Sequence, residues 1–131
     1  MPASSCPVLS RPFLLAVLLA AAGCVDDGLG PDGGPEFGGE YGVMRVVSDP
    51  PLSNNQFTLA LEYGGCGVER AFVVFGRVMG HHADVWIRRP GYRDQCDMLV
   101  GDVRTFDLPA EATRAATVTL LAPGERQFTL R

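Results

Sequence analysis

The sequence predicts an all-β fold, and three observations lead to that expectation. Apolar residues downstream of residue 40 recur in short runs with the two-residue period of strands, turn-forming glycine and proline residues separate these runs, and helical periodicity is almost absent. A length of 131 residues allows one domain. We therefore expect one small β-domain over residues 41–131.

The candidate strands follow in chain order. The clearest is 56–63, where Phe57, Leu59, Leu61 and Tyr63 alternate with more polar neighbours, which is typical of a half-buried antiparallel strand. All seven candidates are residues 42–47, 56–63, 71–78, 83–88, 98–106, 117–121 and 127–130. Seven short strands with frequent turns predict an antiparallel β-sandwich of broadly immunoglobulin-like architecture.

Three details refine this prediction. Residues 71–75 are apolar without alternation, which predicts a central strand covered on both faces. Gly101 interrupts the fifth candidate and predicts a bulge or tight bend. Residues 109–114 predict a single helical turn, and Pro123-Gly124 suits a type II turn.

Charge divides the chain into distinct parts. Residues 41–131 hold ten arginines, ten carboxylates and no lysine, so their net charge is zero, which disfavours a nucleic-acid partner. Residues 24–40 carry five acids, six glycines and two prolines but no base. We expect a flexible tether there, with docking onto the domain as the alternative.

The first 23 residues predict a signal peptide. Their apolar run, residues 13–22, is half the length of about 20 residues that a membrane-spanning helix needs. The junction Ala21-Ala22-Gly23-Cys24 resembles the lipobox of bacterial lipoproteins, although Ala21 stands where that family usually has leucine.

The resemblance implies that the Cys24 sulfur receives a diacylglycerol and that a peptidase then cuts the chain before Cys24. It also implies a bacterial cell-envelope location with the membrane as partner through the lipid anchor, the outer membrane being favoured over the inner. The alternative is an ordinary secretory signal that leaves Cys24 as a free thiol.

Two cysteines remain once Cys6 is removed with the signal and Cys24 is modified. In an oxidising compartment, Cys66 and Cys96 are then expected to form a disulfide. Their separation of 30 residues, with Trp86 close to the second, does not fit the bridge of a true immunoglobulin domain. The segments around the pair are similar to uncharacterised exported bacterial β-domains, a resemblance that implies no activity.

Residues for catalysis are scarce. Downstream of Cys24 the chain has two serines, Ser48 and Ser53, two histidines and no lysine, and nothing places a serine beside a base. His81, His82 and Asp84 are weak metal-ligand candidates, because adjacent residues of a strand point in opposite directions. We expect no enzyme activity and no cofactor, and a polar hairpin tip at the histidines.

A candidate binding patch surrounds the turn after residue 89. It comprises Trp86, Arg88, Arg89, Tyr92 and Arg93, with Trp86 partly exposed. Arginine and aromatic residues are enriched at interface hot spots, so an envelope protein or a small anionic ligand is the expected partner. The alternatives are a solvated hairpin at this turn and, for the whole chain, a protease inhibitor using residues 48–55 or the histidine pair, or a small hydrolase.

Overall fold

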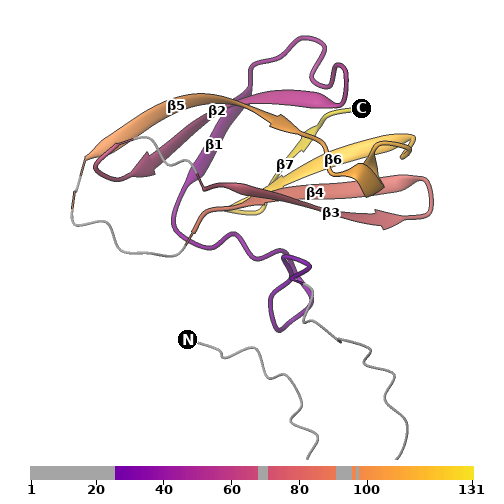
Figure 1. The fold of residues 1–131 in the computed structure, drawn as a ribbon, viewed down its shortest axis with the longest axis horizontal. Helices are drawn as coiled ribbons and strands as arrows, with labels where there is room; N and C mark the ends of the chain where they lie inside the picture. Colours follow the sequence, from indigo (N-terminus) through magenta and orange to yellow (C-terminus); the bar gives the residue numbers. More distant parts are fainter. Residues whose placement is uncertain (1–25, 68–70, 91–95, 97) are drawn as a thin grey trace, which may run out of the picture.

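The computed structural model describes residues 26–67, 71–90, 96 and 98–131, which form two β-sheets (Figure 1). The strands are β1 (Gly42–Val46), β2 (Gln56–Gly64), β3 (Val73–Met79), β4 (His82–Arg88), β5 (Leu99–Asp107), β6 (Thr117–Ala122) and β7 (Arg126–Thr129), with a short 3-10 helix, η1 (Ala110–Ala112). One sheet has the order β1-β2-β5 and the other β3-β4-β6-β7. The all-β prediction is confirmed, and every candidate strand overlaps a strand of the structure.

The two sheets share one hydrophobic core. β2 contributes Phe57, Leu59, Leu61 and Tyr63, all buried, as its alternating pattern predicts. The four-stranded sheet contributes residues such as Val85 of β4 to the same cluster. One face of each sheet is therefore covered by the other.

The fully covered strand is β4, not the run at 71–75. Residues 83–87 of β4 are all buried, whereas β3 lies at the edge of its sheet. The expectation of a central strand at residues 71–78 is thus wrong. Its apolar run has another cause: Phe75 stacks on Trp86, with ring centroids 6.1 Å apart, so the outer face of β3 is partly covered.

Strand pairing also departs from expectation at two places. β4 and β6 pair in parallel, so the prediction of antiparallel pairing throughout is wrong for this pair. Gly101 pairs with Glu62 in an uninterrupted β2–β5 register, and the register shift lies instead between Val43 and Arg45 of β1. The bulge predicted at Gly101 is therefore absent from the described ladder.

Residues 26–40 lie against the four-stranded sheet. The carbonyl of Gly28 accepts a 3.0 Å hydrogen bond from Trp86 Nε1, and the backbone amides of Gly39 and Arg89 donate to the carbonyls of Arg89 and Phe37, respectively. Gly28 has φ +71°, and a Cβ there would come within 2.3 Å of the Phe75 ring. The docked arrangement, rather than a free tether, describes these residues.

No helix of the described chain is long and apolar enough to cross a membrane.

Candidate functional site

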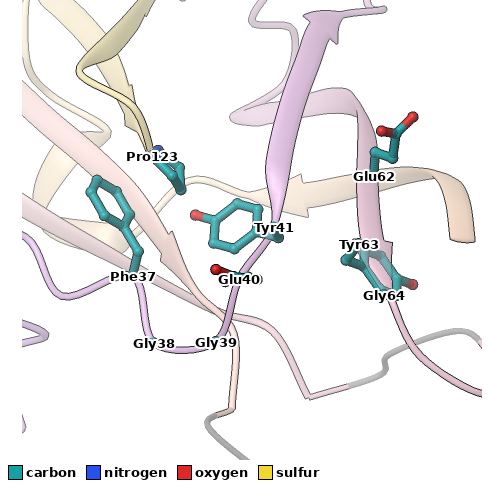
Figure 2. Close-up of a pocket in the computed structure, with 9 residues that line it drawn as sticks. All are labelled: Phe37, Gly38, Gly39, Glu40, Tyr41, Glu62, Tyr63, Gly64 and Pro123. Carbon is teal, nitrogen blue, oxygen red and sulfur yellow. The ribbon is translucent and has the colours of Figure 1, made fainter. Parts of the chain in front are cut away.

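A pocket of about 490 Å³ lies where the docked N-terminal segment meets the start of β1 and the end of β2 (Figure 2). Its lining residues come from three places in the sequence: Phe37, Gly38, Gly39, Glu40 and Tyr41; Glu62, Tyr63 and Gly64; and Pro123. Aromatic rings and glycines dominate this set, and Glu40 and Glu62 are its carboxylate residues. The pocket can therefore offer flat apolar surface with the negative charge of Glu40 beside it, whereas Figure 2 shows the Glu62 carboxylate pointing away from the two tyrosine rings.

Hydrogen bonds fix the two tyrosine rings of the pocket. The Tyr41 hydroxyl donates to the carbonyl of Ile87, and the Tyr63 hydroxyl donates to Asp102 Oδ2 at 3.0 Å. Burial raises the pKa of the Tyr41 phenol, so it stays neutral at physiological pH. Both rings are therefore fixed walls of the pocket.

Arg89 ties the two sides of the pocket together. The residue is only 9% exposed, and its guanidinium donates to the carbonyls of Glu40 at 2.6 Å and Gly64 at 2.5 Å. It also lies 4.9 Å above the centre of the Tyr63 ring. One buried cation therefore holds the end of the N-terminal segment to the end of β2.

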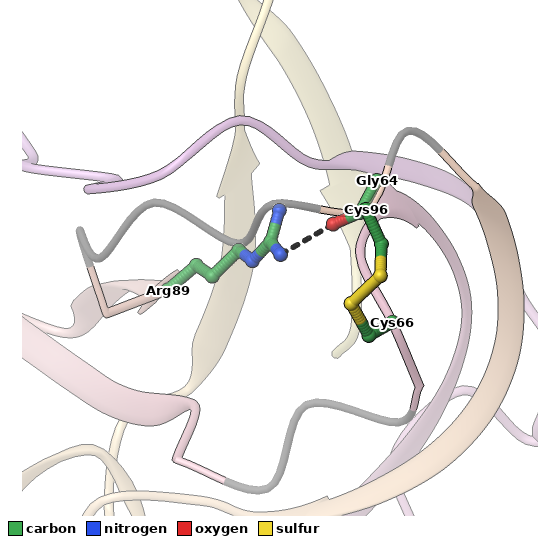
Figure 3. Close-up of a disulfide and its surroundings, with 4 residues drawn as sticks. All are labelled: Gly64, Cys66, Arg89 and Cys96. Atoms are coloured by element: carbon green, nitrogen blue, oxygen red, sulfur yellow. Dashed lines mark hydrogen bonds between the residues drawn. A yellow bond between two sulfur atoms is a disulfide. The ribbon is translucent and has the colours of Figure 1, made fainter.

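A disulfide lies beside this cation, as Figure 3 shows. Cys66 and Cys96 are paired, with Cα atoms 5.0 Å apart, as the cysteine count predicts. The bridge follows the last residues of β2, where the Gly65 amide donates to the Met98 carbonyl. The rim of the pocket at Gly64 is thus fastened by a covalent bond and by Arg89.

The candidate patch is not assembled as the sequence suggests. Trp86 is fully buried, so the expectation that it is partly exposed is wrong. Arg88 pairs with Asp26 and lies 4.6 Å from the Phe75 ring centre, whereas Arg89 points to the pocket side of the strand. Tyr92 and Arg93 lie outside the described residues. Trp86, Arg88 and Arg89 are thus engaged within the chain, as partners of residues 26–40 and of the pocket.

The histidine pair does not converge on a metal site. His82 lies within hydrogen-bonding distance of Asp84 Oδ1 (2.8 Å) and Thr117 Oγ1 (2.7 Å), while His81 is exposed. The carboxylate of Asp84, which is nearly buried, also faces Arg77 at 3.5 Å. Within the described ranges no three potential ligand residues cluster. Asp84 instead joins β3, β4 and, through His82, β6.

Ser48 forms no catalytic pair with His82. Ser48 donates its hydroxyl to the Pro51 carbonyl and accepts the Thr58 amide, so it serves the loop before β2. The hydrogen bonds of His82 go to Thr117 and Asp84. The two residue types that a serine hydrolase combines are engaged separately.

Docking of residues 26–40 should weaken in acid. The hydrogen bonds from Arg88 hold the pKa of Asp26 below its ordinary value, so this pair stabilises docking above the ordinary carboxyl pKa and is lost as pH falls through the lowered pKa. Trp86, the only tryptophan, lies beneath Gly28 and reports the change. We expect its emission to shift towards the red in acid.

The matched variant for this prediction is Asp26→Asn, which removes the charge and keeps the shape. At neutral pH it should move the Trp86 emission in the same direction, by a small amount because the Asp26 side chain is largely exposed. Asp32→Asn, in the same segment but without an ion pair to Arg88, should leave the emission unchanged. An acid shift of equal size in Asp26→Asn and the parent would show that another group is responsible.

Sequence reasoning missed the pocket because part of its wall lies in the segment assigned to a tether. Phe37 and Tyr41 are the signal that was available: two aromatic residues close together after a glycine-rich stretch. Their rings lie 6.5 Å apart in an edge-to-face arrangement.

Comparisons of the chain with protein-family models, with curated proteins and with solved structures each found no match.

Proposed function

We propose that the chain is a lipid-anchored protein of the bacterial cell envelope, favoured at the outer membrane, that acts as a non-enzymatic binding module. The lipobox-like Ala21-Ala22-Gly23-Cys24 supports the anchor. The pocket around Tyr41 and Tyr63 is the observation that supports binding. The domain is proposed as a β-sandwich with immunoglobulin-like layers, modified by the parallel β4–β6 pair.

The shape of the pocket supports binding more than reaction. Its volume of about 490 Å³ is within the range of roughly 300–1,000 Å³ for small-molecule sites, and such sites combine apolar walls with a few placed polar groups. The rings are held by hydrogen bonds before any ligand arrives, so little ordering is needed on binding. Nothing in the lining set supplies a nucleophile paired with a base.

Charge narrows the partner class. Glu40 and Glu62 line the pocket, and the buried guanidinium of Arg89 already donates to two carbonyls and lies over an aromatic ring. A cationic or hydrogen-bond-donating group on an envelope protein therefore fits better than the small anionic ligand. Aromatic walls would add cation–π attraction for such a group.

Charge reversal at the pocket tests this function. The full chain, purified in detergent, is used to capture partners from envelope extract, in parallel with the variants Glu40→Lys and Glu62→Lys. Glu40→Lys should lose at least tenfold of any partner that the parent enriches, while Glu62→Lys, whose side chain points away from the rings, and Glu111→Lys, an exposed change on η1, should retain more of it. Equal capture by all four proteins would remove the pocket as the binding site.

Lipidation is tested at the cysteine of the junction. Cys24→Ala should abolish cleavage before residue 24 and the mass increase of acylation, because no thiol remains to receive the lipid. The variant should then accumulate as a longer, unacylated chain. Intact mass spectrometry and partition between detergent and aqueous phases measure both effects.

The control is Ala21→Leu, which moves the junction closer to the usual lipobox and should be processed at least as fully as the parent. The lipoprotein proposal fails if Cys24→Ala yields the same mature mass and membrane fraction as the parent. An ordinary secretory signal predicts that result, because cleavage near residue 24 would then not depend on the thiol.

A protease inhibitor remains the second candidate, and one observation favours it. The exposed loop 48–55 is held from within, since the Ser48 hydroxyl bonds both the Pro51 carbonyl and the Thr58 amide. A loop that keeps one shape can occupy a protease cleft without being released. Survival of this loop during prolonged incubation with envelope proteases, together with their inhibition, would favour this candidate over the binding module.

A further inference from the structure

The two edges of the three-stranded sheet differ in how they are protected. At β1, the register shifts between Val43 and Arg45, and the Arg126 side chain donates to the carbonyls of Val43 and Met44. Such shifts and covering groups prevent pairing with another strand. β5, at the opposite edge, is nine residues long and has an uninterrupted register, no proline and no lysine.

Hydrogen bonds just beyond the two ends of β5 show which of its backbone N–H and C=O groups point towards β2 and which point outward. Met98 and Leu108 bond to Gly65 and Asn55 beyond the two ends of the β2–β5 ladder. Because antiparallel strands alternate their bonding direction, even-numbered residues of β5 face β2 and odd-numbered residues turn their N–H and C=O groups outward. Across the described ranges, no hydrogen bond reaches the backbone of Leu99, Gly101, Val103 or Thr105 from outside β2.

Two of these residues, Leu99 and Val103, carry exposed apolar side chains. Leu99 is 70% exposed and Val103 63% exposed, although both lie in a regular strand. Gly101 stands between them with open space where a Cβ would be. A long, regular edge strand with outward N–H and C=O groups and exposed apolar side chains favours addition of a further strand.

We propose that β5 pairs antiparallel with β5 of a second copy, with Val103 on the two-fold axis. This register places Asp102 opposite the partner's Arg104, and by symmetry Arg104 opposite the partner's Asp102. Gly101 then faces the partner's Thr105, and Val103 faces its own counterpart. The two three-stranded sheets join into one continuous sheet.

Charge complementarity identifies the second copy as the occupant. Asp102 and Arg104 already pair within the chain at 2.7 Å, and both are largely buried beside Tyr63 and Phe72. In the proposed register the four charges of two copies alternate across the axis, at positions where antiparallel side chains come closest. An arbitrary extended peptide would not supply this matched pair twice.

A charge at the axis tests the dimer. The full chain is measured by sedimentation velocity in mild detergent at less than one protein per micelle, where we expect a concentration-dependent dimer. Val103→Lys places two ammonium groups face to face and should weaken dimerisation at least tenfold. Val78→Lys, at another exposed valine, on β3, should dimerise like the parent. A monomeric parent, or equal dimerisation of both variants, overturns the proposal.

Cysteine cross-linking tests the register without relying on stability. In the proposed dimer, Val103→Cys brings two Cα atoms to about 5.5 Å, within disulfide range. Thr105→Cys, on the same exposed face, separates its two copies by about 13 Å along the strands. Oxidation should therefore link Val103→Cys at least tenfold more than Thr105→Cys. Equal linking would indicate random collision, and no linking would exclude this register.

Discussion

Replacing Trp86 with alanine should lower the free energy of unfolding by about 3–5 kcal/mol, the range for removing a large aromatic residue from a core. Trp86 is fully buried on the outer face of β4, between Phe75 and the docked residues near Gly28. Alanine would leave a cavity there and deprive the Gly28 carbonyl of its donor. Urea unfolding followed by circular dichroism measures the loss.

Two further variants separate packing from hydrogen bonding. Trp86→Phe keeps an aromatic ring against Phe75 but removes the indole N–H, so it should lose about 1–2 kcal/mol. Val73→Ala, at an exposed position of β3, should stay within about 0.5 kcal/mol of the parent. A Trp86→Ala protein as stable as Val73→Ala would contradict the packing of residues 26–40 on the sheet.

The burial of Trp86 could not be predicted from the sequence, whereas the buried face of β2 could. The alternation in β2 was sufficient to predict its buried face, because a local period of two reports directly which side chains face a core. The outer face of β4 gave no such signal. It is covered by residues 26–40, whose glycine and acid content is typical of a linker, and the contact spans 58 residues of sequence.

The site was partly predictable for the same reason. The cysteine pair followed from counting thiols in an oxidising compartment, which needs no knowledge of contacts. The burial of Arg89 did not, since its partners are backbone carbonyls of Glu40 and Gly64 and leave no mark in the sequence. The parallel β4–β6 pair was likewise hidden, because β5 and η1 separate the two strands in the chain.

Removing the disulfide should also have a large effect. Changing both Cys66 and Cys96 to serine opens a loop that the disulfide closes over 30 residues. In the chain-entropy model this lowers the free energy of unfolding by about 3.6 kcal/mol. For a domain of this size the melting temperature should fall by about 15 °C or more. Differential scanning calorimetry on the full chain in detergent measures it.

The position of the bridge makes a sharper expectation possible. The bridge joins the residues that follow β2 to those that precede β5, at one end of the β2–β5 ladder, and the loop that it closes contains β3, β4 and Arg89. Reductant should therefore lower the melting temperature of the parent to that of the double serine variant. It should leave the melting temperature of the variant unchanged. Cys66→Ser alone should match the double variant, since one thiol cannot close the loop. The loop-closure argument would be contradicted if reductant made the thiols of the parent reactive but left its melting temperature unchanged. The bridge would then not constrain the unfolded chain.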